Sequence, residues 1–333
     1  MSNMSDLLIH VSRRAMACEF EVRFPAERYR QGTEAALEAL DLVESLEAEI
    51  SYFQPGSQIS RINALAADGP VEVSPPLFAL LRLAMSLYEE TEGAYDITST
   101  PLWETWGFAR RAGAIPSDAQ LAEARARVGG HLVELDRERR TIRFRRSGVR
   151  INLGSIGKGH ALDVCGQRLT DLGMADFVFH GGQSSVLARG FHLPETPDES
   201  PSPSRHWEIG IRDPRQPGRR LGIVRLHDRG LGTSSGQFQS FRHRGRRYGH
   251  ILDPRSGWPA EGMLATTVVA PTAALADALS TAFYVMGASR SLDYCRTHPE
   301  IGAVLITCQD AGSGRVEVHT AGFRQDEVVI NES

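Results

Sequence analysis

Three segments of this chain carry residues whose types and spacing could do chemistry. The first is INLGSIGKGHALD at residues 151–163, where three glycines surround Lys158 and a strand is predicted to end before a helix. Such a turn offers free backbone N–H groups and a positive helix end, and both suit a phosphate group. The spacing fits neither GxxxxGK[ST] nor GxGxxG. A phosphate-binding turn and a plain glycine-rich turn with a surface lysine are therefore equally supported by these residues alone.

The second segment is LADALSTAFYVMG at residues 275–287. In a helix, Asp277 and Thr281 lie on one face with Ser280 beside them. A carboxylate combined with hydroxyl or carbonyl oxygens is a ligand set that suits Mg²⁺. The alternative is that Asp277 stabilises the N-terminus of its own helix. Isolated pairs of this spacing are common, so the alternative is favoured when the segment is considered alone.

The third segment is GRRYGHILDPRSGWP at residues 245–259. His250 begins a short apolar stretch that is predicted to be a strand, and the DP and SG pairs that follow indicate a turn. Histidine can act as an acid or a base near neutral pH. A histidine that is hydrogen-bonded within a hairpin is the favoured interpretation of this segment alone.

These segments must be positioned by a mixed set of helices and strands. Hydrophobic periodicity predicts an α+β fold, because helices dominate the first part of the chain and strands the later part. The expected helices cover residues 33–50, 77–90, 118–128, 159–172, 275–286 and 289–296. The expected strands include CEFEVRF at 18–24, LVEL, TIRFR, VRINLG, DFVFH, WEIGIR, GIVRL, HILD, TTVVA and two near the C-terminus. Residues 192–205 are rich in Pro, Ser and acid, which predicts an exposed loop.

The composition is that of an ordinary globular protein. Of the 333 residues, 41% are hydrophobic and 23% are charged, and the formal net charge is −4. A general nucleic-acid binder usually carries a basic excess, so no nucleic-acid partner is expected. Arginines do cluster between residues 242 and 247, and they could face phosphates, although a solvated hairpin is the more common explanation.

Four scattered cysteines, none with CxxC spacing, speak against zinc or thioredoxin-like chemistry and suit a reducing compartment. No secretory signal or membrane-spanning stretch is predicted, so stable membrane insertion is not expected and the expected location is the cytoplasm.

Taken together and in this order, the segments resemble the ApbE family, the FAD:protein FMN transferases. SYFQPGSQISRIN, GAYDITSTPLWETWGF, INLGSIGKGHALD, HILDPRSGWP and ADALSTAFYVMG each follow a family motif, and AMAC near Met16 is similar to a degraded Met-Gly-Thr. The resemblance implies one ApbE-like catalytic domain over residues 1–333, with its core match at 13–290. It also implies an α+β fold with mixed or antiparallel sheets and packed helices.

The family implies a substrate, a metal and a partner. FAD would be the substrate and Mg²⁺ the metal cofactor. FMN would pass to a Thr or Ser hydroxyl of an acceptor flavoprotein, with release of AMP. His250 would lie near the transferred phosphoryl group, and Lys158 would hold phosphate. The residues implied to lie on FAD are Met16, Phe53, Ala94, Tyr95, Asp96, Asn152, Lys158 and Ile251. The residues implied to lie on Mg²⁺ are Ser155, through its carbonyl, and Asp277, Ser280 and Thr281.

Two departures from the family pattern keep other functions open. Gln183 and Gln237 stand where the family often has carboxylates, and an amide can neither act as a base nor bind Mg²⁺ by charge. The alternatives are a Mg²⁺-dependent FAD pyrophosphatase that uses water as the nucleophile, and a non-catalytic FAD-binding protein. A purely structural protein is a third alternative.

Overall fold

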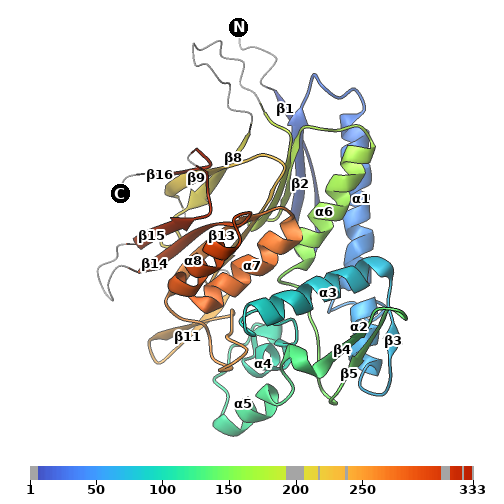
Figure 1. Ribbon diagram of the computed structural model, residues 1–333, viewed down its shortest axis with the longest axis vertical. Coiled ribbons are helices and arrows are strands. Elements are labelled where there is room, and N and C mark those ends of the chain that lie inside the picture. Colours follow the sequence, from blue (N-terminus) through green and yellow to red (C-terminus); the bar gives the residue numbers. More distant parts are fainter. Residues whose placement is uncertain are drawn as a thin grey trace.

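An eight-stranded antiparallel sheet forms the centre of the computed structural model (Figure 1). Its strand order is β1-β2-β6-β7-β10-β13-β14-β15, so the α+β expectation is confirmed. The structure describes residues 7–192, 206–216, 218–236, 239–308, 316–324 and 326–331. The strands are β1 (Leu8–Ala15), β2 (Cys18–Pro25), β6 (Phe177–Gly181), β7 (Ser185–Arg189), β10 (Gly230–Ser235), β13 (Met263–Ala270), β14 (Gly302–Cys308) and β15 (Val316–Ala321).

Both faces of this sheet are covered, which explains the nearly continuous apolar sequences of the strands β6, β13 and β14. In β6, Phe177 and Phe179 pack into a cluster with the helices α1 and α6, whereas Val178 between them packs against a smaller sheet. The helices of the sheet's first face are α1 (Gly32–Ile50), α6 (Gly157–Asp171), α7 (Ala273–Met286) and α8 (Ala288–Thr297). The smaller sheet contains β8 (Trp207–Arg212), β9 (Arg220–Leu226) and β16 (Val328–Ile330).

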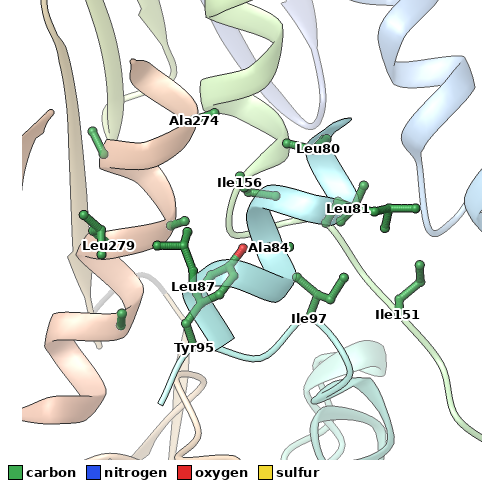
Figure 2. Packing of buried hydrophobic residues seen from close by; sticks show 14 of the residues in the cluster. Leu80, Leu81, Ala84, Leu87, Tyr95, Ile97, Ile151, Ile156, Ala274 and Leu279 are labelled. Atoms are coloured by element: carbon green, nitrogen blue, oxygen red, sulfur yellow. The ribbon is translucent and has the colours of Figure 1, made fainter. Parts of the chain in front are cut away.

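A second group of elements packs beside α7. It comprises α2 (Gln58–Leu65), α3 (Pro75–Glu90), α4 (Thr100–Thr105), α5 (Asp118–Arg125), two short 3₁₀ turns, η2 (Phe108–Arg110) and η3 (Gly130–Leu132), and the strands β3 (Val71–Glu72), β4 (Val133–Asp136) and β5 (Thr141–Phe144). Figure 2 shows the apolar contact: Leu87 of α3 and Tyr95 lie against Leu279 of α7, with Ile156 next to them. This packing holds the glycine-rich turn between the two groups.

The remaining strands form a two-stranded hairpin, β11 (Ser240–His243) and β12 (Arg246–Gly249), which projects from the lower left of the molecule in Figure 1. Among the described residues it pairs with no other strand. Within the same ranges, none of the helices combines the length and the apolarity needed to cross a bilayer.

Most predicted elements are present, and two predicted strands are wrong. The segment VRINLG is extended but pairs with no strand, because the Ile151 amide donates to the Asn63 side chain and the Asn152 amide to the Ile97 carbonyl. The segment HILD contributes only an isolated bridge from Leu252 to Pro259. The helix α5 begins with a capping box between Ser117 and Gln120. Residues 193–205 of the predicted loop lie outside the described residues.

Candidate active site

Two carboxylates tie the helices α6 and α7 together by reciprocal capping. Asp277 of α7 accepts a hydrogen bond from the Gly159 amide in the first turn of α6, at 3.2 Å. Asp163 of α6 accepts from the Ala273 and Ala274 amides at the start of α7, each at 2.8 Å. A carboxylate at a helix N-terminus satisfies free amides and opposes the helix dipole. The idea that Asp277 stabilises its own helix is therefore wrong, because it lies beyond the first turn of α7 and caps α6.

Glycines allow the backbones around Asp277 to approach each other closely. A Cβ atom on Gly159 would lie 2.2 Å from the Ala273 carbonyl oxygen, and one on Gly232 of β10 would lie 2.3 Å from the Ala276 carbonyl oxygen. Gly159 lets α7 approach α6, and this contact fixes the position of Asp277.

Asp277 is a buried carboxylate with one cation close to it. Its side chain is 5% exposed, and the Lys158 ammonium lies 3.7 Å from its Oδ2. The Ser185 hydroxyl donates to its Oδ1 at 3.1 Å. Burial raises the pKa of Asp277, and Lys158 opposes that rise. The two residues that sequence analysis assigned to phosphate and to metal are therefore neighbours in space.

Hydroxyl groups continue from Asp277 along the same helix. The Ser234 hydroxyl of β10 lies 2.8 Å from that of Ser280 and 3.1 Å from that of Thr281. In the glycine-rich turn before α6, the Ser155 hydroxyl donates to the Tyr95 hydroxyl at 3.3 Å. Among the described residues no group of three or more His, Cys, Asp or Glu side chains could hold a metal. Any cation here would use one carboxylate and neutral oxygens, which is a donor set that fits Mg²⁺.

The backbone of the glycine-rich turn is less open to phosphate than its sequence suggests. The Gly154 amide donates to the Asn152 side chain at 2.9 Å, and the Gly157 amide donates to the Leu153 carbonyl at 2.7 Å. The Gly159 amide is bonded to Asp277. The prediction that these amides bind phosphate is not supported, because each has a partner within the chain. The Lys158 ammonium remains the cationic group of the turn.

His250 is held in one tautomer by the base of the β11–β12 hairpin. Its Nδ1 lies 3.0 Å from the Gln239 carbonyl oxygen, which can only accept, so Nδ1 carries the proton. In the neutral ring Nε2 is then an acceptor. Burial lowers the pKa of His250, and the Lys158 ammonium lowers it further. The imidazole is thus neutral at pH 7 and close enough to Lys158 to sense its charge.

The residues predicted to contact FAD fall into two groups. Ala94, Tyr95, Asp96 and Ile251 are buried, and Asn152 is half-buried. Phe53 is 68% exposed and contacts the rings of Tyr52 and Trp103. Their contacts with FAD stay predictions.

Met16 lies at the tip of the β1–β2 hairpin, where its φ of 47° is left-handed. Its amide donates to Glu47 at 2.7 Å, and its side chain packs against two core clusters. The neighbouring Cys18 senses the charges of Lys158 and Asp277, which brings this hairpin next to the site. The role of Met16 on FAD stays a prediction.

Gln183 lies in the turn between β6 and β7 and is exposed. Its amide oxygen accepts from Arg212 at 2.9 Å. The side chain that would be a carboxylate in the family pattern therefore contacts an arginine. Gln237 lies outside the described residues.

A cavity of about 340 Å³ lies between the β11–β12 hairpin and the turn that follows His250. Arg246, Tyr248, Asp253 and Trp258 are among its lining residues, whereas Lys158 and Asp277 are not. This cavity is therefore a neighbour of the candidate site and not the site itself.

Replacing Asp96 by Asn is expected to remove a pH dependence of stability. Burial raises the pKa of Asp96 to about 6, although Thr98 donates to its Oδ1 from the amide and the hydroxyl. Since the folded-state pKa is raised, the contribution of the protonated Asp96 side chain to stability is complete below about pH 4 and is lost as the pH rises through 6. The loss is up to about 3 kcal/mol at pH 7. Asn can accept both hydrogen bonds without the charge.

The measurement is thermal unfolding of both proteins from pH 4.5 to 7.5 without ligands. The midpoint of the Asp96→Asn variant should exceed that of the wild type increasingly with pH. Parallel curves for the two proteins would show that ionisation of Asp96 does not lower the free energy of unfolding.

Several site residues were not found from the sequence. Asp163 belongs to the quoted motif, and a carboxylate one turn after Gly159 in the same predicted helix is the available signal. Ser185 and Ser234 carry no such signal, because only the pairing of β7 and β10 brings them to α7. Sequence spacing cannot reveal contacts that a sheet makes between distant strands.

Comparison with known proteins identifies relatives along nearly the whole chain. Residues 16–305 match the sequence profile of the ApbE family. A FAD:protein FMN transferase of Haemophilus influenzae is 29% identical over 92% of this chain and 88% of its own length. A FAD:protein FMN transferase of Treponema pallidum is 30% identical over 86% of this chain and 80% of its own length.

Solved structures agree with these relatives. The apo form of the Pseudomonas stutzeri flavinyl transferase ApbE superimposes with a TM-score of 0.81 at 26% identity, and covers 96% of both chains. An ApbE protein from Thermotoga maritima superimposes with a TM-score of 0.80 at 26% identity, over 93% of this chain and 96% of the other.

Proposed function

The chain belongs to the ApbE family and is a transferase, and on that premise we propose that it transfers FMN from FAD to another protein. In the finer form of the proposal, a Thr or Ser hydroxyl of the acceptor attacks the FMN phosphorus. The new P–O bond joins FMN to the acceptor, the pyrophosphate bond breaks, and AMP leaves. The reaction depends on Mg²⁺. The observation that carries the proposal is the 3.7 Å approach of Lys158 to the buried Asp277.

The donor set supports a divalent cation beside Asp277. A carboxylate that is 5% exposed, with one ammonium at 3.7 Å and two neutral hydrogen-bond donors, would be stabilised further by a divalent cation. Asp277, the hydroxyls of Ser280 and Thr281, and the Ser155 carbonyl would hold the metal, together with water and phosphate oxygens. When bound, Mg²⁺ would neutralise the charge that develops on the pyrophosphate.

The chain's own residues would hold the phosphates and move a proton. Lys158 supplies a point charge that is 23% exposed, and can reach both Asp277 and a ligand. His250 offers Nε2 as the base that takes the proton from the attacking hydroxyl, because its Nδ1 proton is committed to Gln239. The low pKa of His250 keeps this base unprotonated at neutral pH.

The direct test is incubation with FAD and Mg²⁺, with and without cell extract as the source of acceptors. We expect AMP release that requires the extract and a protein band that carries covalent flavin. AMP and free FMN without extract would favour the pyrophosphatase. Tight FAD binding with neither product would favour a non-catalytic carrier, and no effect of FAD on thermal unfolding would favour a structural protein.

Replacing His250 by Asn is expected to lower the transfer rate about 10²-fold, as the loss of a general base does. The Asn side-chain amide can still donate to Gln239, so thermal unfolding should be little changed. The wild-type rate should fall as the pH drops through the lowered pKa of His250, because the base becomes protonated, and the variant should lack this acidic limb. A variant with wild-type rates and an unchanged pH profile would remove His250 from the mechanism.

A further inference from the structure

One face of the β11–β12 hairpin packs against aromatic residues, and the arginines of the other face are exposed. On the inner face Phe241 and Tyr248 stack with their ring centroids 5.4 Å apart, and both contact Trp106. At the base, the backbone amide and Nδ1 of His250 both bond to the Gln239 carbonyl. The hairpin is therefore held firmly, with its base at His250. Its outer face carries Arg242 and Arg247, which are both exposed.

The arginines of the β11–β12 hairpin are placed where they lower its stability. Arg242 lies directly opposite Arg247 in the strand pair, and His243 lies opposite Arg246. Like charges directly across a strand pair, as in Arg242 and Arg247, are destabilising. Arg244 occupies the turn with φ 49°, a conformation that usually takes Gly or Asn. In the described part of the chain only Arg246 of these arginines has an acidic partner, Glu261. Arg247 donates to the Ser240 hydroxyl and to the Gly236 carbonyl, and the side chains of Arg242 and Arg244 have no partner among the same residues.

We infer that this outer face, formed by Arg242, Arg244 and Arg247, docks an acidic segment of the acceptor protein. The inference rests on the proposed transfer function. Arg242 and Arg247 lie three residues from the hairpin base, which is about 10 Å along a strand from His250. An acidic segment here would relieve the repulsion between opposed arginines and hold its neighbouring hydroxyl beside the base. The docking surface thus accounts for a local charge arrangement that folding does not favour.

The charge of the whole chain selects an acidic protein segment over a nucleic acid. The three arginines of the proposed surface lie on one hairpin, whereas the formal net charge of the chain is −4. Exposed charges interact over only about 8 Å at physiological salt. A short acidic segment fits within that range. A long polyanion would extend beyond the three arginines onto the rest of the chain, whose net charge is negative.

The test measures binding without turnover. The probes are two fluorescein-labelled peptides of twelve residues with a central Thr, one flanked by Asp and the other by Asn in the same positions. The full chain is compared with the double variant Arg242→Gln/Arg244→Gln. The matched control, Arg137→Gln/Arg139→Gln, removes two exposed charges from the turn between β4 and β5.

We expect the Asp peptide to bind more tightly than the Asn peptide at low salt. The hairpin variant should weaken its binding about tenfold, and the control should not. Thermal unfolding of the hairpin variant should be unchanged or slightly raised, since a like-charge pair is relieved. Equal binding of both peptides, or equal weakening by the control, would overturn the inference.

Two further measurements separate other ligands and the function itself. Tighter, Arg242-dependent binding of a single-stranded DNA oligonucleotide, or loss of FAD binding in the hairpin variant, would assign the hairpin to another anion and overturn the inference. Arginine-dependent peptide binding in a chain that transfers no FMN would refute only the proposed function. Transfer to proteins of an extract that is unaffected by the hairpin variant would refute only the docking surface.

Discussion

Replacing Asp277 by Asn lowers FMN transfer about 10³-fold and leaves the fold intact. Removing one preorganised charge or donor from a buried site commonly costs that much in rate. Asn can still accept from the Gly159 amide and bond to Ser185, so the contact between α6 and α7 persists. Because burial raises the pKa of Asp277, the carboxylate reduces stability at neutral pH, and the neutral amide should keep or raise the unfolding temperature.

The measurement combines AMP release, its dependence on Mg²⁺ concentration, and thermal unfolding. In the wild type, Mg²⁺ should raise the unfolding temperature in the presence of FAD, and this shift should disappear in the variant. Asp171→Asn, at the exposed end of α6, is the matched control and should change none of these three measurements. Wild-type Mg²⁺ dependence in the Asp277 variant would place the metal elsewhere.

Replacing Gly159 by Ala destabilises the protein by about 3 kcal/mol or more, although Ala favours helices over Gly by about 1 kcal/mol. The new Cβ would lie 2.2 Å from the Ala273 carbonyl oxygen and 2.6 Å from the Ala274 nitrogen. Both are backbone atoms at the capped start of α7, so the clash can be relieved only by moving α7. Movement of α7 also displaces Asp277, and activity should fall together with stability.

Gly166→Ala is the control for this effect in the same helix. Its Cβ would meet the end of the Leu187 side chain at 2.3 Å, and a flexible side chain can shift where a backbone cannot. Chemical denaturation should show a clearly smaller loss for Gly166→Ala than for Gly159→Ala. Similar losses for both variants would show that α7 is not held in place by this contact.

The sequence by itself predicted most of the elements and proposed the main site residues. Helical periodicity located α1, α3 and α7 within a few residues, because their buried faces repeat at helical spacing. The motif order identified Lys158, His250 and Asp277 as a set, although each motif alone favoured or equalled a structural explanation. Local patterns carry this information because the buried residues of each element recur at the period of that element.

Only the tertiary structure decided how these residues act on one another. The strands predicted at VRINLG and HILD are absent. The backbone groups of VRINLG bond to the Asn63 side chain and the Ile97 carbonyl, and those of HILD bond mostly within the turn that follows, to residues 257–260. The amides of Gly154, Gly157 and Gly159 are bonded within the chain, and Gly159 serves helix packing.

The exchange of caps between Asp163 and Asp277 depends on the crossing of two helices that are more than a hundred residues apart. Residue types and local spacing specify which groups are available. Their distances, burial and pKa values arise from contacts between distant segments, which no local pattern contains.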